Sequence, residues 1–294
     1  MDLTPNEEQQ MLREASIDWL NGNMPLDAAR TRDPGLWGGM AEMGWLDMTL
    51  PEMGLDHGSE ALVFAELGRF LAPVGAIATA VSRRWAGDTE RAALAIPSAN
   101  GLRLLDPDNT DSALGLWDGK AGTVTLRSAP EARVSLDLTT RQAVLDDAPE
   151  PAIINDPRAA LHLALLAAAY GVGCGDAARD MAVEYAKIRE QFGKPIGSFQ
   201  GIKHPVADMA VRCAVARSQL YYAACALDAD DSDAPFHVAA AKRLADRAAL
   251  ENGRMNIQVH GGIGMTDEAQ PHLLLKRAHL LQFVAPVDTG ALLA

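Results

Sequence analysis

The feature that most constrains this fold is a series of four long helical patterns that fills the second half of the chain. The sequence predicts helices over about 157–188, 199–227, 235–260 and 267–285. The second of them carries apolar residues at three- and four-residue spacings, which form one stripe on a helix surface: Ile202, Val206, Met209, Cys213, Leu220 and Ala224. Because the connections between the helices are short, this half of the chain predicts an antiparallel four-helix bundle.

The N-terminal part carries helix-start signals. Thr4, followed by Pro5 and then by Glu7, predicts a helix that begins with Thr4 as its N-cap and runs to about residue 21. Asp33 starts a second short helix, and Ser59 starts a third that ends near residue 71. This part of the chain is therefore expected to be a small helical domain.

Between these helical parts the sequence changes to short apolar runs separated by Gly, Asp and Pro. The runs 102–105, 114–117, 123–126 and 132–136 predict strands and turns. The expected fold class is therefore mainly α with a reduced β-domain. The predicted division is a helical domain over 1–82, a reduced β-domain over 83–150 and the four-helix bundle over 151–294.

Composition excludes several classes of protein. The formal net charge is −13, which argues against nucleic-acid binding because that requires clustered Lys and Arg. The three cysteines, Cys174, Cys213 and Cys225, are too widely spaced for a disulfide framework or a metal site, so we expect a reducing cytoplasm and no bound metal. The start of the chain lacks the features of a signal peptide. The apolar run 159–175 is shorter than the ~20 residues that span a bilayer, so it predicts a buried helix rather than membrane insertion.

Two segments carry residues suited to an anionic ligand. Residues 189–200 read Arg-Glu-Gln-Phe-Gly-Lys-Pro-Ile-Gly-Ser-Phe-Gln, and 258–264 read Gln-Val-His-Gly-Gly-Ile-Gly. The guanidinium of Arg189 is a planar fork of donors that matches phosphate oxygens, and Gly261 and Gly262 allow backbone N–H groups to approach an anion. A simpler interpretation remains open, in which Arg189 and the glycines only terminate helices.

These segments resemble the C-terminal domain of the flavin-dependent acyl-CoA dehydrogenases. Residues 43–54 and 65–69 resemble the same family's N-terminal helices, so four pieces occur in the family's order. The resemblance implies that Arg189, Gln191 and Phe192 contact the diphosphate and adenosine of FAD. It further implies that Gln258, Gly261 and Gly262 contact the same FAD, which belongs to a neighbouring subunit.

The family's catalytic base is missing from both of its expected positions. Aligning Gln282 with the family's glutamine places Ala285 where most members carry the glutamate that removes the substrate's α-proton. The alternative position, on the first bundle helix, falls at Leu163. The neighbouring His162 is predicted to be a core residue. Asp288 could replace the base only through a shifted loop.

The family's flavin-ring motifs are also missing between residues 83 and 147. The resemblance therefore implies the short, base-less subunit of a heteromeric acyl-CoA dehydrogenase, an α2β2 heterotetramer that acts on an acyl-CoA such as a steroid side-chain thioester. The catalytic partner would supply the glutamate and the flavin-ring site, and FAD would be shared. Two alternatives remain: a homo-oligomeric flavoenzyme with an atypical base, and a non-catalytic interaction protein.

Overall fold

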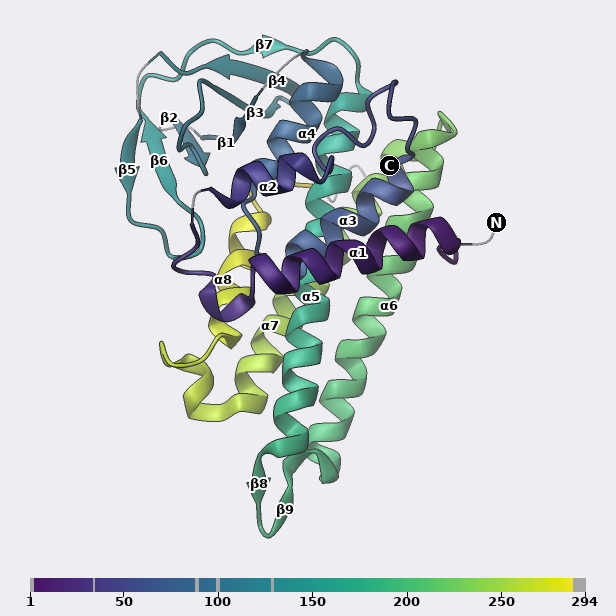
Figure 1. Ribbon diagram of the computed structural model, residues 1–294, viewed down its shortest axis with the longest axis vertical. Helices are drawn as coiled ribbons and strands as arrows, with labels where there is room; N and C mark the ends of the chain where they lie inside the picture. Colours follow the sequence, from purple (N-terminus) through teal and green to yellow (C-terminus); the bar gives the residue numbers. More distant parts are fainter. Residues whose placement is uncertain (1–2, 34, 88–89, 99–100, 128–129, 288–294) are drawn as a thin grey trace.

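The four predicted bundle helices form the long axis of the molecule (Figure 1). The computed structural model describes residues 3–33, 35–87, 90–98, 101–127 and 130–287. The bundle helices are α5 (Arg158–Ile188), α6 (Gln200–Asp228), α7 (Ala234–His260) and α8 (Pro271–Leu281). The first three agree with the predicted ranges to within one residue, whereas α8 starts about four residues later than predicted. The prediction of a bundle is confirmed.

Helix α5 is the core of the bundle. It packs against α3, α6, α7 and α8, and the run 159–175 lies inside the protein as predicted. Among the described helices it is the one long and apolar enough to span a membrane, but 83% of its most apolar 18-residue window is buried inside the protein. Its apolar composition is therefore explained by packing against neighbouring helices.

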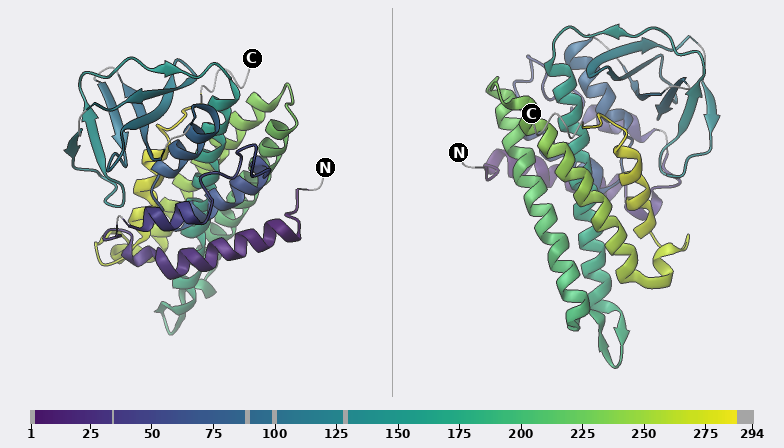
Figure 2. Two further views of the ribbon diagram at one scale, coloured as in Figure 1. Left: turned by 45° about the horizontal axis from the view of Figure 1, so that its top comes forward. Right: turned by 180° about the vertical axis from the view of Figure 1, so that it is seen from behind.

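The N-terminal helices lie across one side of the bundle (Figures 1 and 2). They are α1 (Glu7–Asn23), η1 (Leu26–Ala28), α2 (Leu36–Glu42), α3 (His57–Arg69) and α4 (Gly75–Trp85). The predicted N-cap at Thr4 is wrong. Asn6 caps α1, because its side chain accepts from the Gln9 N–H at 2.9 Å while Gln9 Oε1 accepts from the Asn6 N–H at 3.1 Å.

The N-cap of α3 also differs from the prediction. Asp56 occupies this position, and its Oδ1 accepts from the backbone N–H of Ser59 at 2.7 Å. Ser59, which was expected to start the helix, is the donor to this cap and lies inside α3. For α2, the start lies at Leu36 rather than at Asp33, whose Oδ1 instead accepts from the Gly35 N–H at 2.8 Å.

A seven-stranded sheet covers one end of the bundle. Its spatial order is β5-β6-β2-β1-β3-β4-β7, and every neighbouring pair is antiparallel except β1 and β3. The strands are β1 (Ala92–Ser98), β2 (Gly101–Leu105), β3 (Ser112–Trp117), β4 (Lys120–Thr125), β5 (Glu131–Arg133), β6 (Gln142–Leu145) and β7 (Ala152–Ile153). The run predicted as a strand over 132–136 ends at Arg133, and Val134 and Leu136 are exposed. The predicted division at 82 and 150 stays a prediction.

Two glycines allow α3 and α5 to cross at close range. A Cβ at Gly173 would lie 1.8 Å from the carbonyl oxygen of Ala65, and a Cβ at Gly68 would lie 2.1 Å from that of Tyr170. Both contacts are with backbone atoms, which cannot move aside as a side chain can. The crossing therefore requires glycine at each position.

Arg277 on α8 joins the sheet, the N-terminal helices and the bundle. Its side chain is fully buried, and its Nε lies 2.5 Å from Oδ2 of Asp137, in the segment after β5. It also donates to Oη of Tyr170 on α5 and to the carbonyl of Ala72 at 3.0 Å, and to Oγ1 of Thr139 at 2.8 Å. Burial alone would raise the pKa of Asp137, but the adjacent guanidinium keeps this pKa below its usual value.

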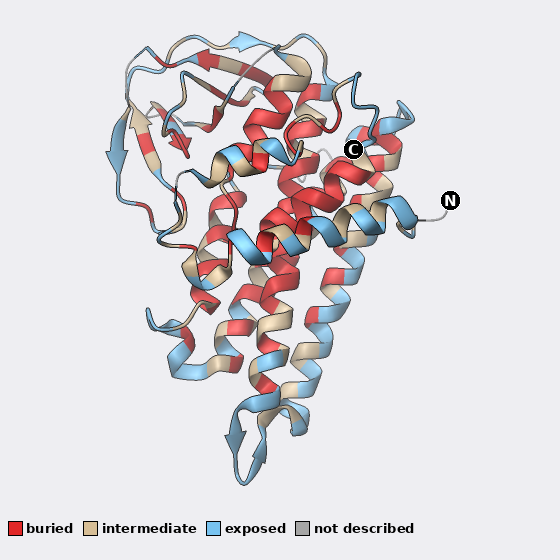
Figure 3. Ribbon diagram, in the orientation of Figure 1, coloured by how far each residue is buried: buried red, intermediate tan, exposed pale blue. Residues whose placement is uncertain are grey.

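The opposite end of the bundle is uncovered. In Figure 3, buried residues are concentrated along the part of α5 beside the sheet and the N-terminal helices, whereas exposed residues dominate the far end. The ends of α5 and α7 and the start of α6 project beyond those layers. This projecting end carries residues 189–200 and 258–264, the two segments predicted to bind an anionic ligand.

Candidate functional site

The segment after α5 folds into a small hairpin at the tip of the bundle (Figure 1). Its strands are β8 (Glu190–Gln191) and β9 (Lys194–Pro195). Phe192 and Gly193 form the turn with φ angles of 53° and 76°, and a two-residue hairpin turn with both angles positive matches the twist of the strands. The N–H of Ile196 donates to the carbonyl of Arg189 at 2.8 Å and closes the hairpin.

The side chains on this hairpin are directed away from the rest of the chain. Phe192 is 92% exposed, and its ring meets that of Phe199 edge to face, at 6.1 Å between ring centroids. Gln191 is exposed, and its amide donates to the carbonyl of Glu190 at 2.9 Å. Arg189 is exposed, and its guanidinium makes no ion pair within the described part of the chain. The hairpin thus presents a free arginine and a bare aromatic ring.

The second segment forms the end of α7. Gln258 is exposed in the last turn, and Gly261 terminates the helix with φ 65° and ψ −143°, a conformation that glycine adopts without strain. The following residues form η3 (Gly261–Met265). Nothing lies within 4 Å of a Cβ placed on Gly262, and its φ is not in the left-handed region. No contact among the described residues therefore requires glycine at 262.

An aromatic stack brings the two segments together. The rings of Tyr185, near the end of α5, and His260, the last residue of α7, lie 4.1 Å apart with an interplanar angle of 22°. The carbonyl of Tyr185 accepts the backbone N–H of Arg189 at 2.9 Å. The structure therefore places the predicted cofactor-binding residues at the ends of two neighbouring helices.

The positions expected for a catalytic base hold no carboxylate. Ala285 is 6% exposed, and Leu163 is buried in the core. Asp288 lies outside the described residues. A hollow of about 390 Å³ separates the sheet from α8, and its described lining includes Ile96, Leu136, Leu280 and Phe283 together with Arg103, Lys276 and His279. The one carboxylate in this lining is Asp137, which its partner Arg277 makes a weak base.

A buried carboxylate that was not predicted from the sequence contacts His162, the neighbour of Leu163 in the chain. Glu60 on α3 lies with its Oε2 2.6 Å from Nε2 of His162. The indole N–H of Trp85 donates to Nδ1 of the same ring at 3.0 Å, so the ring proton resides on Nε2 and points to Glu60. His162 is thus a satisfied core residue, as predicted. Glu60 lies 102 positions from His162 in the sequence, and no local sequence pattern indicates that the two residues are in contact.

The same cluster contains enough donor atoms for a metal ion but has little capacity to bind one. Ligand atoms of His57, Glu60 and His162 lie within 4.8 Å of one another. However, both ring nitrogens of His162 already have hydrogen-bond partners. A metal bound at Nε2 would require the proton to move to Nδ1, where the N–H of His162 would then face the indole N–H of Trp85. Nδ1 of His57 is bonded to Asp228 at 2.5 Å. Trp85, His162 and Glu60 are better explained as a hydrogen-bonded chain. His57 is held separately by Asp228, and its Nε2 has no hydrogen-bond partner among the described residues.

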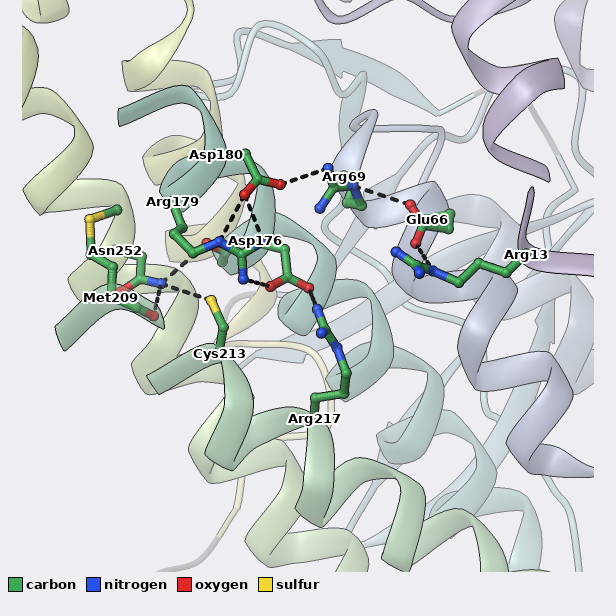
Figure 4. Close-up of polar contacts among 11 residues, drawn as sticks. Arg13, Glu66, Arg69, Asp176, Arg179, Asp180, Met209, Cys213, Arg217 and Asn252 are labelled. Carbon is green, nitrogen blue, oxygen red and sulfur yellow. Dashed lines mark hydrogen bonds and ion pairs between the residues drawn. The ribbon is translucent and has the colours of Figure 1, made fainter. Parts of the chain in front are cut away.

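A charged network crosses the middle of the bundle (Figure 4). Asp176, 2% exposed, accepts from Arg179 at 2.9 Å and from Arg217. Asp180 accepts from Arg69 of α3 at 2.8 Å. The network continues through Glu66 to Arg13 of α1. Because each of these carboxylates is paired with arginine, the network attaches the N-terminal helices to the bundle and has no free base.

The cysteines are free thiols with low reactivity. Cys174 and Cys213 are buried, and Cys225 is partly buried. Burial raises the pKa of Cys174 and of Cys213 to about 12, with Asp176 contributing at Cys213. At neutral pH neither forms the thiolate that nucleophilic catalysis or metal binding requires.

Comparison with known proteins gives consistent matches over nearly the whole chain. The family model for the acyl-CoA dehydrogenase N-terminal domain matches residues 6–87, and the model for the C-terminal domain matches 158–285. The chain is 35% identical over 300 residues to acyl-CoA dehydrogenase IpdE2 of Mycobacterium tuberculosis, covering 94% of this chain and 92% of IpdE2.

Several solved structures share the fold of this chain. The Tcur3481-Tcur3483 steroid ACAD superposes with a TM-score of 0.80 at 22% identity, covering 98% of this chain and 96% of the other. The ChsE4-ChsE5 complex of M. tuberculosis gives 0.77 at 22% identity, covering 99% and 97%. At this level of identity the likeness establishes the fold alone.

Proposed function

The chain belongs to the acyl-CoA dehydrogenase family, and on that premise we propose that it is the companion subunit of a heteromeric enzyme. Its role is to complete an FAD site that a catalytic partner shares, as in an α2β2 heterotetramer. The observation that carries this proposal is the tip of the bundle, where Arg189 and Phe192 are exposed. Groups suited to a dinucleotide are thus presented outward.

The residues at the tip fit FAD chemically. The guanidinium of Arg189 can donate to the diphosphate. Nothing lies within 4 Å of a Cβ placed on Gly261 or Gly262, so a ligand can approach the backbone closely there, although the N–H of Gly261 already donates to the carbonyls of Gln258 and Ile257. Gln191 and Gln258 add amide donors at the same tip, and the Phe192 ring can cover the adenosine and exclude water. When bound, FAD supplies the two-electron oxidation of the acyl-CoA.

The absence of a base at Ala285 and Leu163 assigns proton removal to the partner. A carboxylate within reach of the substrate's α-carbon is required for this step. Glu60 has no exposed surface, and Asp137 is bound to Arg277. We therefore assign both the glutamate and the flavin-ring site to the catalytic subunit.

The substrate class and compartment follow as part of the proposal. The shared fold with a steroid ACAD supports a CoA thioester of a steroid side chain or a similarly bulky acid. The three free cysteines support a cytoplasmic complex.

Expression of the chain alone and together with its catalytic partner tests the proposal. Alone, the purified chain should bind little FAD and show no dehydrogenase activity, measured by its flavin absorbance and by acyl-CoA-dependent reduction of an artificial electron acceptor. Co-expression should give a yellow, active complex whose mass by light scattering contains both chains. A yellow, active homo-oligomer of this single chain would overturn the proposal.

A second function, a homo-oligomeric flavoenzyme with an atypical base, is favoured by one observation: the carboxylate of Glu60 lies 2.6 Å from His162, which precedes Leu163 in the sequence. Glu60→Gln keeps the shape of this side chain, and Asp288→Asn does the same for the shifted-loop candidate. Under the companion-subunit proposal, the complex of either variant with the catalytic partner keeps the turnover of the native complex. A catalytic base would instead lose about two to four orders of magnitude in turnover, with FAD content and assembly unchanged.

A further inference from the structure

The imidazole of His260 has a fixed tautomer. Its Nδ1 lies 2.9 Å from the backbone carbonyl oxygen of Asn256. Because a carbonyl oxygen can only accept a hydrogen bond, Nδ1 carries the proton. In the neutral ring, Nε2 then holds a lone pair and can act only as an acceptor.

The same ring is also fixed in orientation. It stacks on the side chain of Tyr185, with 4.1 Å between the ring centroids. The backbone carbonyl of Tyr185 accepts the N–H of Arg189 at 2.9 Å, so the stack lies one helical turn before Arg189. Burial lowers the pKa of His260, although the bond to Asn256 opposes this shift, so the ring is neutral at pH 7. His260 directly precedes Gly261 and is only half-buried, which leaves it within reach of a ligand.

A neutral acceptor at this place has a different role from the arginine. Arg189 attracts any diphosphate and cannot distinguish what is attached to it. A lone pair on Nε2 repels phosphate oxygens but matches a neutral O–H or N–H donor. Resting on the proposed function, in which the partner holds the flavin ring, the part of FAD that reaches this tip is its adenosine half. The donors there are the two ribose hydroxyls and the adenine amino group.

We propose that Nε2 of His260 accepts a hydrogen bond from a ribose hydroxyl or from the adenine amino group of FAD. His260 is then the specificity-determining residue of this half-site, and Tyr185 is the residue that positions it. Together they select a dinucleotide whose adenosine is intact, whereas Arg189 supplies affinity for the diphosphate.

Reconstitution of the assembled complex with altered dinucleotides tests this assignment. The flavin is removed, and binding of FAD is compared with binding of its 2′-deoxyadenosine, 3′-deoxyadenosine and hypoxanthine analogues, by titration of flavin fluorescence. The matched variant is His260→Phe, which keeps a planar ring over Tyr185 and removes the acceptor. The analogue that lacks the recognised donor should bind about two- to tenfold more weakly to the native complex, as expected for one neutral hydrogen bond.

In the His260→Phe complex, FAD and that analogue should bind equally, both at the reduced level. His260→Gln, whose side-chain oxygen can accept at a similar reach, should restore part of the discrimination. The identity of the discriminated analogue distinguishes the two hydroxyls and the amino group. Unchanged thermal unfolding of His260→Phe would show that the stack is preserved.

Two outcomes separate this inference from the function on which it rests. If the native complex binds all four dinucleotides equally, or if His260→Phe discriminates as the native complex does, the role of His260 is wrong. If FAD binding in the same complex is unaffected by Arg189→Ala, the shared-site proposal fails first. Equal binding of the analogues together with an Arg189-dependent affinity would overturn only the His260 assignment.

Discussion

The two ends of the bundle use arginine in opposite ways. At the sheet end, Arg277 is fully buried and its donors bind the sheet segment, the N-terminal helices and α5 of its own chain. At the far end, Arg189 is exposed on a hairpin beside a phenylalanine that is 92% exposed. The arginine at the sheet end is hydrogen-bonded within its own chain, whereas the arginine at the far end is exposed to solvent.

This difference indicates which functions the chain performs alone. A buried charge is tolerated only when it is paired and hydrogen-bonded, so Arg277 must be a structural residue. An exposed arginine contributes little to the stability of its own chain. The exposed Arg189 hairpin is therefore available to a ligand or to a second subunit, as the proposed function requires.

The largest expected effect is a loss of stability when the buried ion pair of Arg277 is removed. Arg277→Met should lower the free energy of unfolding by about 3–5 kcal/mol, because it leaves the carboxylate of Asp137 buried without its charged partner. Urea titration followed by circular dichroism measures this loss. Arg189→Met makes the same chemical change at the exposed end and should alter stability by less than about 0.5 kcal/mol. Equal losses in the two variants would contradict the comparison.

At the exposed end the effect should appear in binding instead. Arg189→Ala should weaken FAD retention in the assembled complex by about 1.5–3 kcal/mol, one to two orders of magnitude, because a charge-assisted hydrogen bond is lost. Equilibrium dialysis against FAD measures the change, and the melting temperature of the isolated subunit should stay constant. Unchanged flavin affinity would mean that Arg189 is only a helix-end residue.

The close crossing of α3 and α5 can be disrupted by a substitution that changes no charge. Gly173→Ala places a methyl group 1.8 Å from the Ala65 carbonyl, so α3 must separate from α5, and we expect a loss of about 1–3 kcal/mol in unfolding free energy. Gly201→Ala is the control, since nothing lies within 4 Å of its added Cβ. A Gly173→Ala protein as stable as the control would show that the helices do not need this close crossing.

The smallest expected effect is a pH dependence of the unfolding free energy, caused by His272 near the start of α8. Burial, with Lys276 and Arg30 nearby, lowers the pKa of His272. Because Arg30 donates to Nε2 of His272 at 2.8 Å, the folded state holds this ring neutral. The unfolded state therefore binds more protons just below pH 6.5, and the contribution of His272 to stability is lost as the pH falls through that range.

Unfolding measured between pH 7.5 and 5.5 should show this loss, and His272→Gln should remove part of the slope. His260, whose pKa is also lowered by burial, accounts for a further part. An unchanged slope in the His272 variant would assign the pH dependence to other groups.

Most of the bundle could be predicted from sequence, but the starts of the N-terminal helices could not. The long helices were recognised because their apolar residues repeat at helical spacing and because few residues interrupt them. At the N-terminus, Thr4 and Asn6 are both acceptable caps, and the choice depended on the reciprocal bond between Asn6 and Gln9. Helix α4 and strands β1, β6 and β7 carry weak local patterns and were not recognised.

The sequence by itself determined the family, the helical bundle and the types of residue suited to FAD. It did so because helical periodicity and short motifs are properties of neighbouring residues. Only the tertiary structure placed Glu60 beside His162, joined Asp137 to Arg277 and stacked Tyr185 on His260. These pairs lie between 75 and 140 positions apart, and such contacts depend on how the helices and the sheet pack rather than on any local pattern. For the same physical reason, the exposure of Arg189 and the burial of Arg277 could not be distinguished until the chain was folded.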